Sequence, residues 1–454
     1  MINEDIVKEL FGYFKENYGF KIENATDLFD AERNLLEFLV RIGRRIENKF
    51  FEEIGTEYLG NIVEKDGKEY EFKDYREKSI HGLFGVIEYR RAYYVSREPG
   101  QGSFIPLDEK LGIDKKHTPG CNYFFSFFTG QDVYQESLDR FHEIFRPDGT
   151  GLLSMRKVLD MDYELGDKLE GMRQREIEEV FEEGQEIEKE EVISGTMAVS
   201  IDATKVREKL GEELDENGKK TIEIGFKDAK IAGISLVEWD EKEGEAVCVN
   251  TSYVTGIEYA DDFFRRIWVE MTRRSNDTEA NRIVFLGDGA TWIWDRTGDI
   301  GNDNSIEVLD FYHASEHISD VCKALYGEQT QPFKQHYDKW RGLTYEGEID
   351  TVLSELKRLR DTCEKDSLRD ELQGEISYFE TNRDRMHYDE YRKMGIPIGS
   401  GVVESACKHV IGKRLKLSGM TWSPAGARGM LQIRSSLKSN RFQKDFRRTL
   451  ADAA

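Results

Sequence analysis

The order of strands and helices between residues 196 and 310 constrains the fold of this chain more than any other feature. Apolar and β-branched residues dominate three runs of strand length, at 197–201, 230–237 and 246–254. The turn Asp-Glu-Lys-Glu-Gly at 240–244 separates the second run from the third. Because a short polar turn with glycine favours an antiparallel connection, these two runs are predicted to form a hairpin.

A helix and two more strands follow the predicted hairpin. Apolar side chains recur at helical spacing at Phe263, Phe264, Ile267, Trp268 and Met271. Two short apolar strands come next, at 283–286 and 306–309. The ribonuclease H-like fold has this order of elements: three strands, a helix, a strand, a second helix and a strand. We therefore predict an α/β protein with a ribonuclease H-like domain.

Three carboxylates stand at distinctive points of this pattern. Asp202 and Asp288 directly follow apolar strands, and Glu404 comes early in a predicted helix. Open α/β sheets bind ligands beyond the carboxyl ends of their strands, so the two aspartates are expected at one edge. Hard divalent ions prefer carboxylate oxygens, and two ions ~3.5–4 Å apart stabilise both the attacking and the leaving oxygen at a phosphodiester. We predict that Asp202, Asp288 and Glu404 are catalytic and bind two Mg²⁺ or Mn²⁺ ions.

Each of these carboxylates also has a structural interpretation. An aspartate after a strand commonly caps the next turn. Glu404 could pair with Lys408, four residues later, on a solvent-exposed helix face. It lies four residues after Ser400, whereas a capping box requires three. The sequence Gly-Ser-Gly at 399–401 makes a tight helix start whose free N–H groups can meet a phosphate, which favours the metal-binding interpretation.

A segment between the two strand-borne aspartates and Glu404 offers a different metal chemistry. His313, Glu316 and His317 have the spacing His-x-x-Glu-His of an inverted zinc peptidase, in which both histidines bind zinc and the glutamate is the base. No third ligand is marked downstream, so this is the weaker interpretation. Five cysteines are scattered without a Cys-x-x-Cys pair, and zinc is not expected; they are Cys121, Cys248, Cys322, Cys363 and Cys407.

Charge is distributed unevenly along the 454 residues. The chain has a formal net charge of −24, yet residues 401–454 contain 11 Lys and Arg against 3 Asp and Glu, a net of +8. A basic segment on an acidic chain is typical of a local phosphate contact surface, although salt adaptation would explain the acidic excess. Trp422, in this segment, could stack on a base or pack in the core. Contacts to double-stranded DNA are predicted for Lys408, Lys413, Arg414, Lys416, Arg428, Arg434 and Lys438.

The sequence lacks the features of a secreted or membrane protein. Its first residues, Met-Ile-Asn-Glu-Asp, have neither the basic nor the apolar region of a signal peptide. No apolar run approaches the ~20 residues that cross a bilayer. The scattered cysteines fit a reducing compartment. We therefore expect a cytoplasmic protein without a membrane partner.

Three regions precede the ribonuclease H-like domain. Residues 1–59 have helical periodicity, residues 60–115 form a small β-rich module, and residues 116–192 return to helix. In the third region a helix, the glycine-containing turn 146–151 and a helix capped by Ser154 have the shape of a helix-turn-helix DNA reader. Any αα-hairpin has the same shape, so the sequence leaves both interpretations open.

The ribonuclease H-like domain is predicted to be discontinuous. It is expected over residues 193–320 and 391–440, and a polar helical insertion, 321–390, separates the two parts. Ser423, followed by proline, is a strong start for the final helix of this domain. Residues 441–454 are expected to be a basic tail.

Several segments carry a family resemblance. The DDE transposases of ISKra-type bacterial and archaeal insertion sequences resemble this chain in GDGATWIW, LDFYHASEH, MHYDEYRKMGIPIGSGVVESACK and RLKLSGMTWSPAGA. The upstream segments RRAYYV and PLDEKLG resemble the same family. The resemblance covers residues 82–440 and is most specific in its C-terminal segments.

The resemblance implies metal-dependent DNA strand cleavage and strand transfer at insertion-sequence ends, by phosphodiester hydrolysis and transesterification. It implies a ribonuclease H-like catalytic domain with Asp202, Asp288 and Glu404 as metal ligands. Asp310 and His313 match an Asp-x-x-His element of relatives, and would support these ligands or contact DNA. The implied partners are transposon-end and target DNA, bound by a homo-oligomer. The alternative is a domesticated or inactive relative that binds DNA without cutting it.

Two departures from the family pattern stand out. Relatives often carry paired cysteines, as a small zinc ribbon, in the segment that corresponds to residues 60–100, where this chain has none. The module is therefore a degenerate zinc ribbon without zinc. Glycine usually follows the first aspartate, and Ala203 stands there in this chain. Alanine adds one methyl group, which leaves Asp202 able to bind a metal ion.

Overall fold

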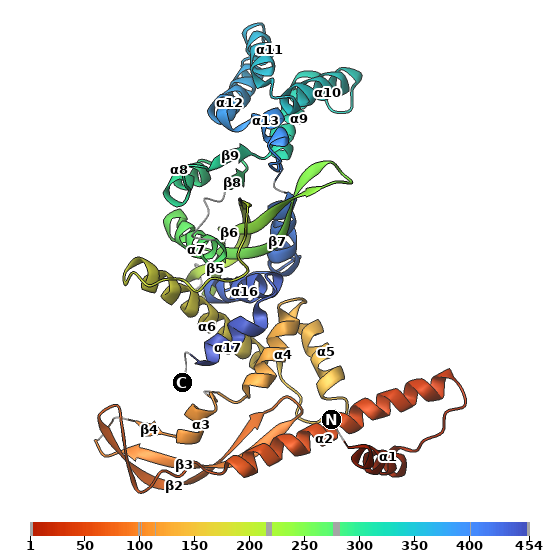
Figure 1. Ribbon diagram of the computed structural model, residues 1–454, viewed down its shortest axis with the longest axis vertical. Helices are drawn as coiled ribbons and strands as arrows, with labels where there is room; N and C mark the ends of the chain where they lie inside the picture. The colour runs from red at the N-terminus through yellow and green to blue at the C-terminus, as the bar shows by residue number, and fades with distance from the viewer. Residues whose placement is uncertain are drawn as a thin grey trace. The chain divides into compact units, whose positions relative to one another are not determined.

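The chain forms a mixed α/β protein that divides into two compact units (Figure 1). The first unit comprises Met1–Leu169 with Phe442–Ala454, and the second comprises Glu170–Arg441. In the part of the chain that the structure describes, no helix is long and apolar enough to cross a membrane. The structure is a computed structural model that describes residues 3–98, 100, 102–113, 115–214, 220–275, 282–399 and 401–451.

The first unit begins with two helices, as the periodicity predicted. Helix α1 (Glu4–Tyr18) is capped by the side chain of Asn3, and α2 (Ala25–Ile54) by that of Asn24. Each asparagine accepts backbone N–H groups of the first turn, which have no partner within the helix.

An antiparallel sheet follows in the order β1-β2-β3-β4. Asp66 and Gly67, both with positive φ, make the two-residue turn from the first strand to the second. The sheet confirms the strand character predicted after residue 60. Its strands are β1 (Ile62–Lys65), β2 (Lys68–His81), β3 (Val86–Ser96) and β4 (Ser103–Phe104).

Four helices follow the sheet, and three of them share a core. Phe125, Phe141 and Val158 are fully buried in it. The predicted cap at Ser154 is confirmed, because its hydroxyl accepts the backbone N–H of Lys157 at 3.3 Å. The helices are α3 (Pro106–Lys110), α4 (Pro119–Thr129), α5 (Tyr134–Phe145) and α6 (Met155–Phe181), and the division between the units falls inside α6.

The end of the chain is a helix rather than the predicted basic tail. Helix α17 (Phe442–Ala451) buries Phe442 and Phe446. The ring of Tyr123 stacks on Phe442 at 5.2 Å between centroids and meets Phe446 edge-on. The aromatic spacing i, i+4 places both rings on one helix face. The prediction of a basic tail considered only the number of basic residues and overlooked this spacing.

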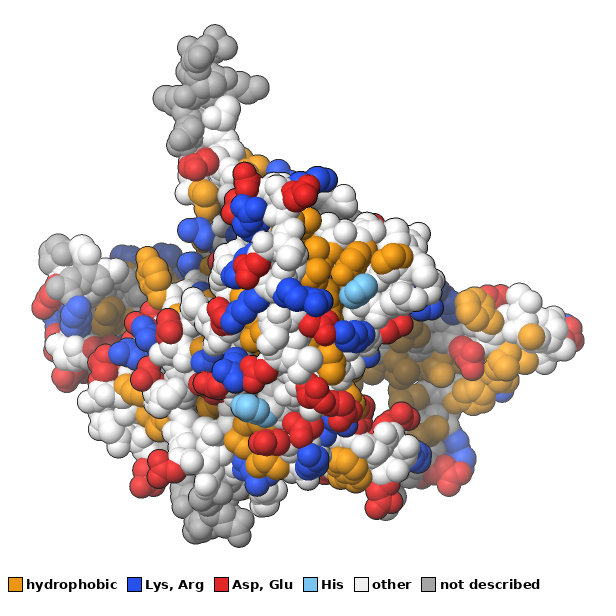
Figure 2. All heavy atoms as spheres, turned by 90° about the horizontal axis from the view of Figure 1, so that it is seen from above, with side chains coloured by type: hydrophobic (Ala, Val, Ile, Leu, Met, Phe, Trp, Pro, Cys, Tyr) orange, Lys and Arg blue, Asp and Glu red, His pale blue; other side chains and the backbone are white. Residues whose placement is uncertain are grey.

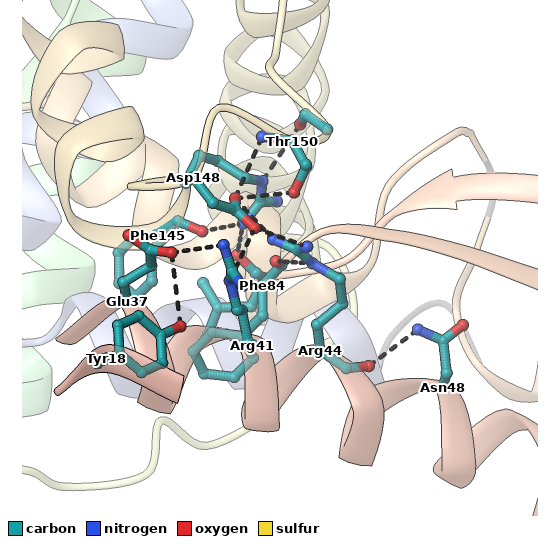
Figure 3. A network of polar contacts seen from close by, with 12 residues as sticks. Tyr18, Glu37, Arg41, Arg44, Asn48, Phe84, Phe145, Asp148 and Thr150 are labelled. Carbon is teal, nitrogen blue, oxygen red and sulfur yellow. Dashed lines mark hydrogen bonds and ion pairs between the residues drawn. The ribbon is translucent and has the colours of Figure 1, made fainter. Parts of the chain in front are cut away.

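The turn between α5 and α6 is held by an arginine cluster (Figure 3). Both terminal nitrogens of Arg44, on α2, donate to the carboxylate of Asp148 at 3.0 Å, and its Nε donates to the Phe84 carbonyl at 2.9 Å. Burial alone would raise the pKa of Asp148, but hydrogen bonds from Arg44 and Thr150 outweigh it and hold the pKa well below its usual range. The turn predicted for a DNA reader is thus fixed by charge pairing, and its DNA-reading role stays a prediction.

The second unit contains a five-stranded mixed sheet in the order β7-β6-β5-β8-β9. Strands β5, β8 and β9 run parallel, whereas β6 pairs antiparallel with both β5 and β7. The predicted order of strands and the predicted β6–β7 hairpin are confirmed. The strands are β5 (Thr196–Leu214), β6 (Lys220–Asp240), β7 (Glu245–Gly256), β8 (Arg282–Gly287) and β9 (Ile306–Leu309).

Helix α7 (Ala260–Arg274) leads from β7 to β8, and α8 (Thr291–Ile300) connects the parallel strands β8 and β9. The predicted apolar face of α7 is confirmed, since Phe263 and Ile267 are fully buried in the core of this unit. The same core contains Phe285 of β8. The parallel strands are therefore buried and positioned by packing, as central strands of α/β sheets are.

The helical insertion shares this hydrophobic core. Trp340 and Leu356 are buried in it, and Leu356 belongs to the apolar face of the helix at residues 349–361. On the face seen in Figure 2, basic and acidic side chains are interspersed. Some charged side chains of the insertion form ion pairs, such as Lys339 with Glu355 at 2.6 Å. The helices are α9 (Phe311–Tyr326), α10 (Gln331–Tyr345), α11 (Ile349–Asp361), α12 (Asp366–Asn382), the 3₁₀ turn η1 (Arg383–Arg385) and α13 (Tyr388–Lys393).

The last helices of the second unit return to the sheet. The predicted Ser423 cap is confirmed, because its hydroxyl accepts the N–H of Gly426 at 3.1 Å. The side chain of Gln432 donates to the carbonyl of Thr255, on β7, at 3.2 Å. The elements are α14 (Gly401–Ala406), the π-helical turn η2 (Cys407–Gly412), α15 (Lys413–Leu415) and α16 (Pro424–Lys438).

Candidate active site

Asp202 and Asp288 lie at the same edge of the parallel part of the sheet. The last parallel pair between β5 and β8 is Ser200 with Leu286. Asp202 is two residues beyond this pair, and Asp288 is the first residue after β8. The prediction that Asp202 ends its strand was wrong, because β5 continues to Leu214 by antiparallel pairing with β6. Asp202 thus lies inside a long strand, at the point where the parallel pairing stops.

The carboxylate of Asp202 is half-buried and held by two donors. Its Oδ1 accepts the N–H of Ala203 at 2.6 Å, and its Oδ2 accepts the thiol of Cys407 at 3.0 Å. Burial raises the pKa of Asp202, and the charge of Asp288 raises it further, while these hydrogen bonds and His313 act in the opposite direction. The two aspartates are therefore close enough to repel each other.

The loop after Asp288 fixes the second carboxylate. Oδ1 of Asp288 accepts the N–H of Ala290 at 3.0 Å, the turn interaction that the structural interpretation foresaw. Gly289 between them has φ +80°, a region that favours glycine. Among the described residues, neither Asp202 nor Asp288 forms an ion pair with a lysine or arginine. The carboxylate pair is left without a compensating cation of the protein.

Glu404 stands apart from this pair. It lies in α14 with an exposed side chain, and no contact among the described residues joins it to either aspartate. It also forms no ion pair with Lys408 there, so the surface-pair interpretation is not realised. Ser400, the middle residue of the Gly-Ser-Gly start, lies outside the described residues. Glu404 is one helical turn from Cys407, which binds Asp202, so α14 is anchored beside the aspartates.

No three His, Cys, Asp or Glu side chains gather closely enough to hold a metal ion within the described ranges. The arrangement brings together two of the three predicted ligands. The third is placed on a helix whose next turn touches the first. Burial and the charge of Asp202 raise the pKa of the Cys407 thiol, so Cys407 is a donor to Asp202 rather than an anionic ligand.

Asp310 and His313 lie next to the aspartates. Asp310 follows β9, caps α9 by accepting the N–H groups of Tyr312 at 2.6 Å and His313 at 3.1 Å, and donates its own N–H to the Gly287 carbonyl at 2.8 Å. The Asp-x-x-His element thus turns the chain from the sheet into α9. Its histidine is near enough to Asp202 to lower that residue's pKa.

The two histidines of the zinc-peptidase spacing have different partners. Nδ1 of His313 lies 3.3 Å from Glu316, whereas Nδ1 of His317 lies 2.7 Å from Glu375 on α12. The His317 ring also stacks on Tyr378 at 3.7 Å between centroids. This arrangement separates the histidines instead of presenting them to one ion.

The predicted DNA-contact residues divide into buried and exposed groups. Arg414 is 0% exposed and lies over the Trp422 ring, and Trp422 is 7% exposed with its Nε1 donating to Leu415. Arg434 is 1% exposed and donates to backbone carbonyls of η2. Packing uses the side chains of Arg414 and Arg434, contrary to the DNA contacts predicted for them. Of the two alternatives left open for Trp422, core packing is the one observed. The exposed ones are Lys408, Lys413, Lys416, Arg428 and Lys438.

A groove of about 970 Å³ reaches Asp288 and Ala203 from the β5–β6 side. Its lining carries charges of both signs together with Trp292. The basic side chains are Lys227, Lys230 and Arg428, and the acidic ones are Glu208, Glu223, Asp228, Glu258 and Asp288. Nζ of Lys230 lies 5.5 Å from the Trp292 ring centroid. The three cations and the Trp292 ring are the groups of this mixed lining that can contact an anionic or planar ligand.

Sequence reasoning missed Cys407, Tyr378, Lys227 and Lys230, whereas it named Arg428, the third basic residue of the groove. Cys407 follows Glu404 by one turn, so helical spacing could have indicated that it shares the site. The strand was predicted to begin at Lys230, whereas β6 begins at Lys220, so the position of Lys227 opposite β5 was not foreseen. Lys230 was inside the predicted strand but was not named as a site residue. No sequence signal marks Tyr378, since α12 is remote in the chain from both aspartates.

A comparison with protein families matches residues 21–120 and 222–446 to UPF0236, an uncharacterised protein family. The chain belongs to the UPF0236 family. The matched residues of this UPF0236 chain include Asp288, Asp310 and Glu404, whereas Asp202 lies between the two matched ranges.

Relatives of the UPF0236 family occur in Caldanaerobacter subterraneus subsp. tengcongensis. UPF0236 protein TTE2489 is 24% identical over 427 residues, which are 91% of this chain and 80% of that protein. UPF0236 protein TTE0610/TTE0881/TTE1053/TTE2432 is 25% identical over 448 residues, 95% of this chain and 83% of that protein. A third, whose name joins eleven such designations, is 23% identical over 438 residues. The similarity extends over nearly the whole chain.

Proposed function

We propose that this UPF0236 protein is a DDE-type DNA transposase that cleaves DNA at the ends of an insertion sequence and joins the freed 3′ end to target DNA. The observation that carries the proposal is the pair Asp202 and Asp288. They share one sheet edge, repel each other, and have no basic partner among the described residues. Uncompensated carboxylates in such a position mark candidate functional sites.

The topology of the sheet supports a ribonuclease H-like catalytic domain. Three antiparallel strands are followed by two strands parallel to the first, in the order β7-β6-β5-β8-β9. The two aspartates lie on or after the central strands β5 and β8. Ligands of open α/β sheets bind at such an edge, where adjacent strands leave a crevice.

The donor set fits divalent magnesium or manganese. Asp202, Asp288 and Glu404 offer the hard oxygen ligands that such ions prefer, and a cation would relieve the repulsion between the aspartates. Two bound ions would supply activation of the attacking water or 3′-OH and stabilisation of the leaving oxygen. Cys407 and the Ala290 N–H orient the two aspartates. The proposal requires Glu404 to turn toward them from the first turn of α14.

Basic side chains near the aspartates support a DNA ligand. Lys227, Lys230 and Arg428 line the groove that reaches Asp288. Lys416 donates to the Thr204 hydroxyl at 2.6 Å, two residues after Asp202. Phosphates in this groove would have cationic partners on both sides of the carboxylates.

The names of the relatives give independent support. One joins four designations and another joins eleven. We take joined designations as separate copies of one gene in one genome. A sequence that copies itself to new positions produces this pattern, whereas a housekeeping enzyme is rarely kept in so many copies.

The test is cleavage of DNA that carries the sequences flanking the gene. Purified full-length protein is incubated with this DNA and Mg²⁺ or Mn²⁺, and the products are mapped at nucleotide resolution. Asp202→Asn, Asp288→Asn and Glu404→Gln should each reduce cleavage by at least about 10³-fold while binding persists, because each change removes a ligand charge at constant volume. EDTA should stop the reaction, and Mg²⁺ should restore it.

Asp240→Asn provides a matched control, since Asp240 is an aspartate at the end of β6 that accepts backbone N–H groups of the hairpin turn. It should cleave as the wild type does. Specific binding without cleavage in either metal would favour the domesticated DNA-binding alternative. Activity lost to a zinc-selective chelator and restored only by Zn²⁺ would contradict the two-magnesium chemistry.

A further inference from the structure

Tyr378, on α12 of the helical insertion, lies against the backbone that follows Asp288. A Cβ added to Gly289 would be 2.7 Å from Cε2 of Tyr378 and 3.1 Å from its hydroxyl oxygen. These distances are too short for an ordinary side chain. The positive φ of Gly289 and the absence of its side chain therefore let the phenol approach the carboxylate site directly.

The hydroxyl of Tyr378 is a buried donor without an acceptor. Its oxygen is shielded from solvent and has no hydrogen-bond partner among the described residues. Burial raises the pKa of Tyr378, and the nearby carboxylates Asp288, Asp310 and Glu375 raise it further, so the phenol stays protonated. Nearly all buried polar groups in folded proteins are paired, so this O–H calls for an explanation.

The phenol ring is held in place from behind. It stacks on the His317 ring at 3.7 Å with an angle of 20° between the planes. His317 is fixed in turn by Glu375, 2.7 Å from its Nδ1. Glu375 is one turn before Tyr378 on α12, so one helix face carries both groups. The Tyr378 hydroxyl is thus held in a fixed position, and none of the charged side chains around it accepts its hydrogen bond.

We propose that the Tyr378 hydroxyl contacts the substrate, by donating a hydrogen bond to a non-bridging oxygen of the phosphodiester bound at Asp202 and Asp288. This inference rests on the proposed function. A phosphodiester oxygen is an anionic acceptor, and a rigid donor beside it stabilises the charge that builds on this oxygen during strand cleavage. The helical insertion would thereby supply a group to the chemistry of the sheet.

Tyr378→Phe tests the contact, because it removes one oxygen and keeps the ring on His317. With flanking DNA and Mg²⁺, the variant should cleave bound DNA about 10- to 100-fold more slowly in single turnover, the usual loss for one pre-organised donor. Its affinity for DNA should stay within about twofold, since many other phosphate contacts hold the duplex.

Tyr326→Phe is the matched control. Tyr326 also stacks on a histidine of the same insertion, His336, at 4.2 Å and 22°. The substitution removes the same atom, and its cleavage rate should equal that of the wild type. A second comparison uses stability. Tyr378→Phe should unfold at the wild-type temperature or above, whereas Tyr388→Phe, which loses a bond to the Leu309 carbonyl at 3.0 Å, should unfold earlier.

A methylphosphonate at the mapped cleavage position decides between contact and packing. In one diastereomer the methyl group replaces the oxygen that Tyr378 would reach, and on that substrate Tyr378→Phe should cause no further loss. An equal loss on all substrates would show a packing role and overturn the inference. Wild-type cleavage by Tyr378→Phe, with the Asp288→Asn variant inactive, would overturn it while leaving the proposed function intact. A wild-type protein that never cleaves DNA would overturn both.

Discussion

Two carboxylate clusters in this protein are built in opposite ways. In the first unit, both terminal nitrogens of Arg44 donate hydrogen bonds to the carboxylate of Asp148, and Nε of Arg41 lies 3.8 Å from it (Figure 3). These contacts hold the pKa of Asp148 low. In the second unit, Asp202 lies beside Asp288 with only a thiol and a backbone N–H as donors, and its pKa is raised. The paired carboxylate joins elements of a fold. The unpaired ones leave a charge for a ligand to neutralise.

The basic residues of the second unit divide in the same way. Lys339 and Lys357, on the insertion, each lie 2.6 Å from a glutamate. Lys408, Lys413 and Lys416 are exposed and form no ion pair within the described ranges. Paired surface charges contribute little beyond solubility. Unpaired cations keep their charge available, and under the proposed function they would meet DNA phosphates.

The largest effect expected from this comparison concerns the paired carboxylate. Asp148→Asn should lower the free energy of unfolding of the first unit by about 3 kcal/mol, because it leaves the half-buried guanidinium of Arg44 without its counter-charge. All six tryptophans lie in residues 239–422, within the second unit. Urea unfolding followed by circular dichroism should therefore shift, while tryptophan fluorescence reports an unchanged second unit.

The pH dependence of this difference has a definite sign. The folded-state pKa of Asp148 is depressed, so its contribution to stability is present above the unfolded value near ~3.9 and is lost as the pH falls toward the folded value. The difference in free energy of unfolding between the wild type and Asp148→Asn should be constant near neutral pH and should disappear below about pH 4. A gap that widened on acidification would contradict the pairing.

Much of the second unit follows from the sequence, and the exceptions have physical causes. Local sequence patterns correctly predicted the position of Asp288 after β8, the β6–β7 hairpin and the Ser423 cap, because each of these features depends on residues that are close in sequence. The true end of β5 was missed because its polar second half is stabilised by pairing with β6 rather than by its own apolar residues. Charge counts likewise could not separate an exposed lysine from Arg414, which is buried over an aromatic ring.

Tertiary contacts between distant segments lie beyond such reasoning. The bond from Cys407 to Asp202 spans 205 residues. Tyr378 reaches Gly289 from an insertion whose own pattern is that of an ordinary amphipathic helix. The spacing of Cys407 from Glu404 is the one local hint, and it does not identify Asp202 as the partner. Both contacts concern the side chains that surround the aspartates. The sequence predicted the carboxylates and left their surroundings open.

An intermediate effect is expected from the unpaired lysines. Replacing Lys408, Lys413 and Lys416 together with glutamine should weaken binding to all duplexes, because each can bind a phosphate. The log–log salt slope should become shallower by about 0.9 for each phosphate that is no longer neutralised, and by roughly 2–3 for the triple variant. Filter binding or fluorescence anisotropy between 50 and 200 mM salt, the range over which ~6–10 phosphate contacts change affinity strongly, measures the slope.

The matched control replaces paired lysines of the insertion, Lys339 and Lys357, with glutamine. This variant removes positive charge at positions that already have acidic partners, so its salt slope should equal that of the wild type. Equal slopes for both variants would show that the C-terminal lysines are a solvated surface. Arg414→Ala should instead lower stability, since its guanidinium is buried over Trp422.

The smallest effect concerns the unpaired carboxylate itself. In EDTA at neutral pH, Asp202→Asn should raise the stability of the second unit, by up to about 1 kcal/mol as for other modest single substitutions. The folded-state pKa of Asp202 is raised, so its charge opposes folding above that pKa and not below the unfolded value near ~3.9. The gain should therefore vanish on acidification, as the loss expected for Asp148→Asn does, but the two effects have opposite signs at neutral pH.

Divalent ions should reverse the sign of the stability difference between the wild type and Asp202→Asn. Mg²⁺ that binds only the folded protein stabilises it by about 2.7 kcal/mol at 100 times its Kd, and the variant that lacks one ligand forgoes most of this gain. Tryptophan fluorescence should then rank the wild type above Asp202→Asn in Mg²⁺ and below it in EDTA. The same order in both conditions would mean that Asp202 is a structural carboxylate like Asp148, with its partner in the thiol of Cys407 rather than in a metal ion.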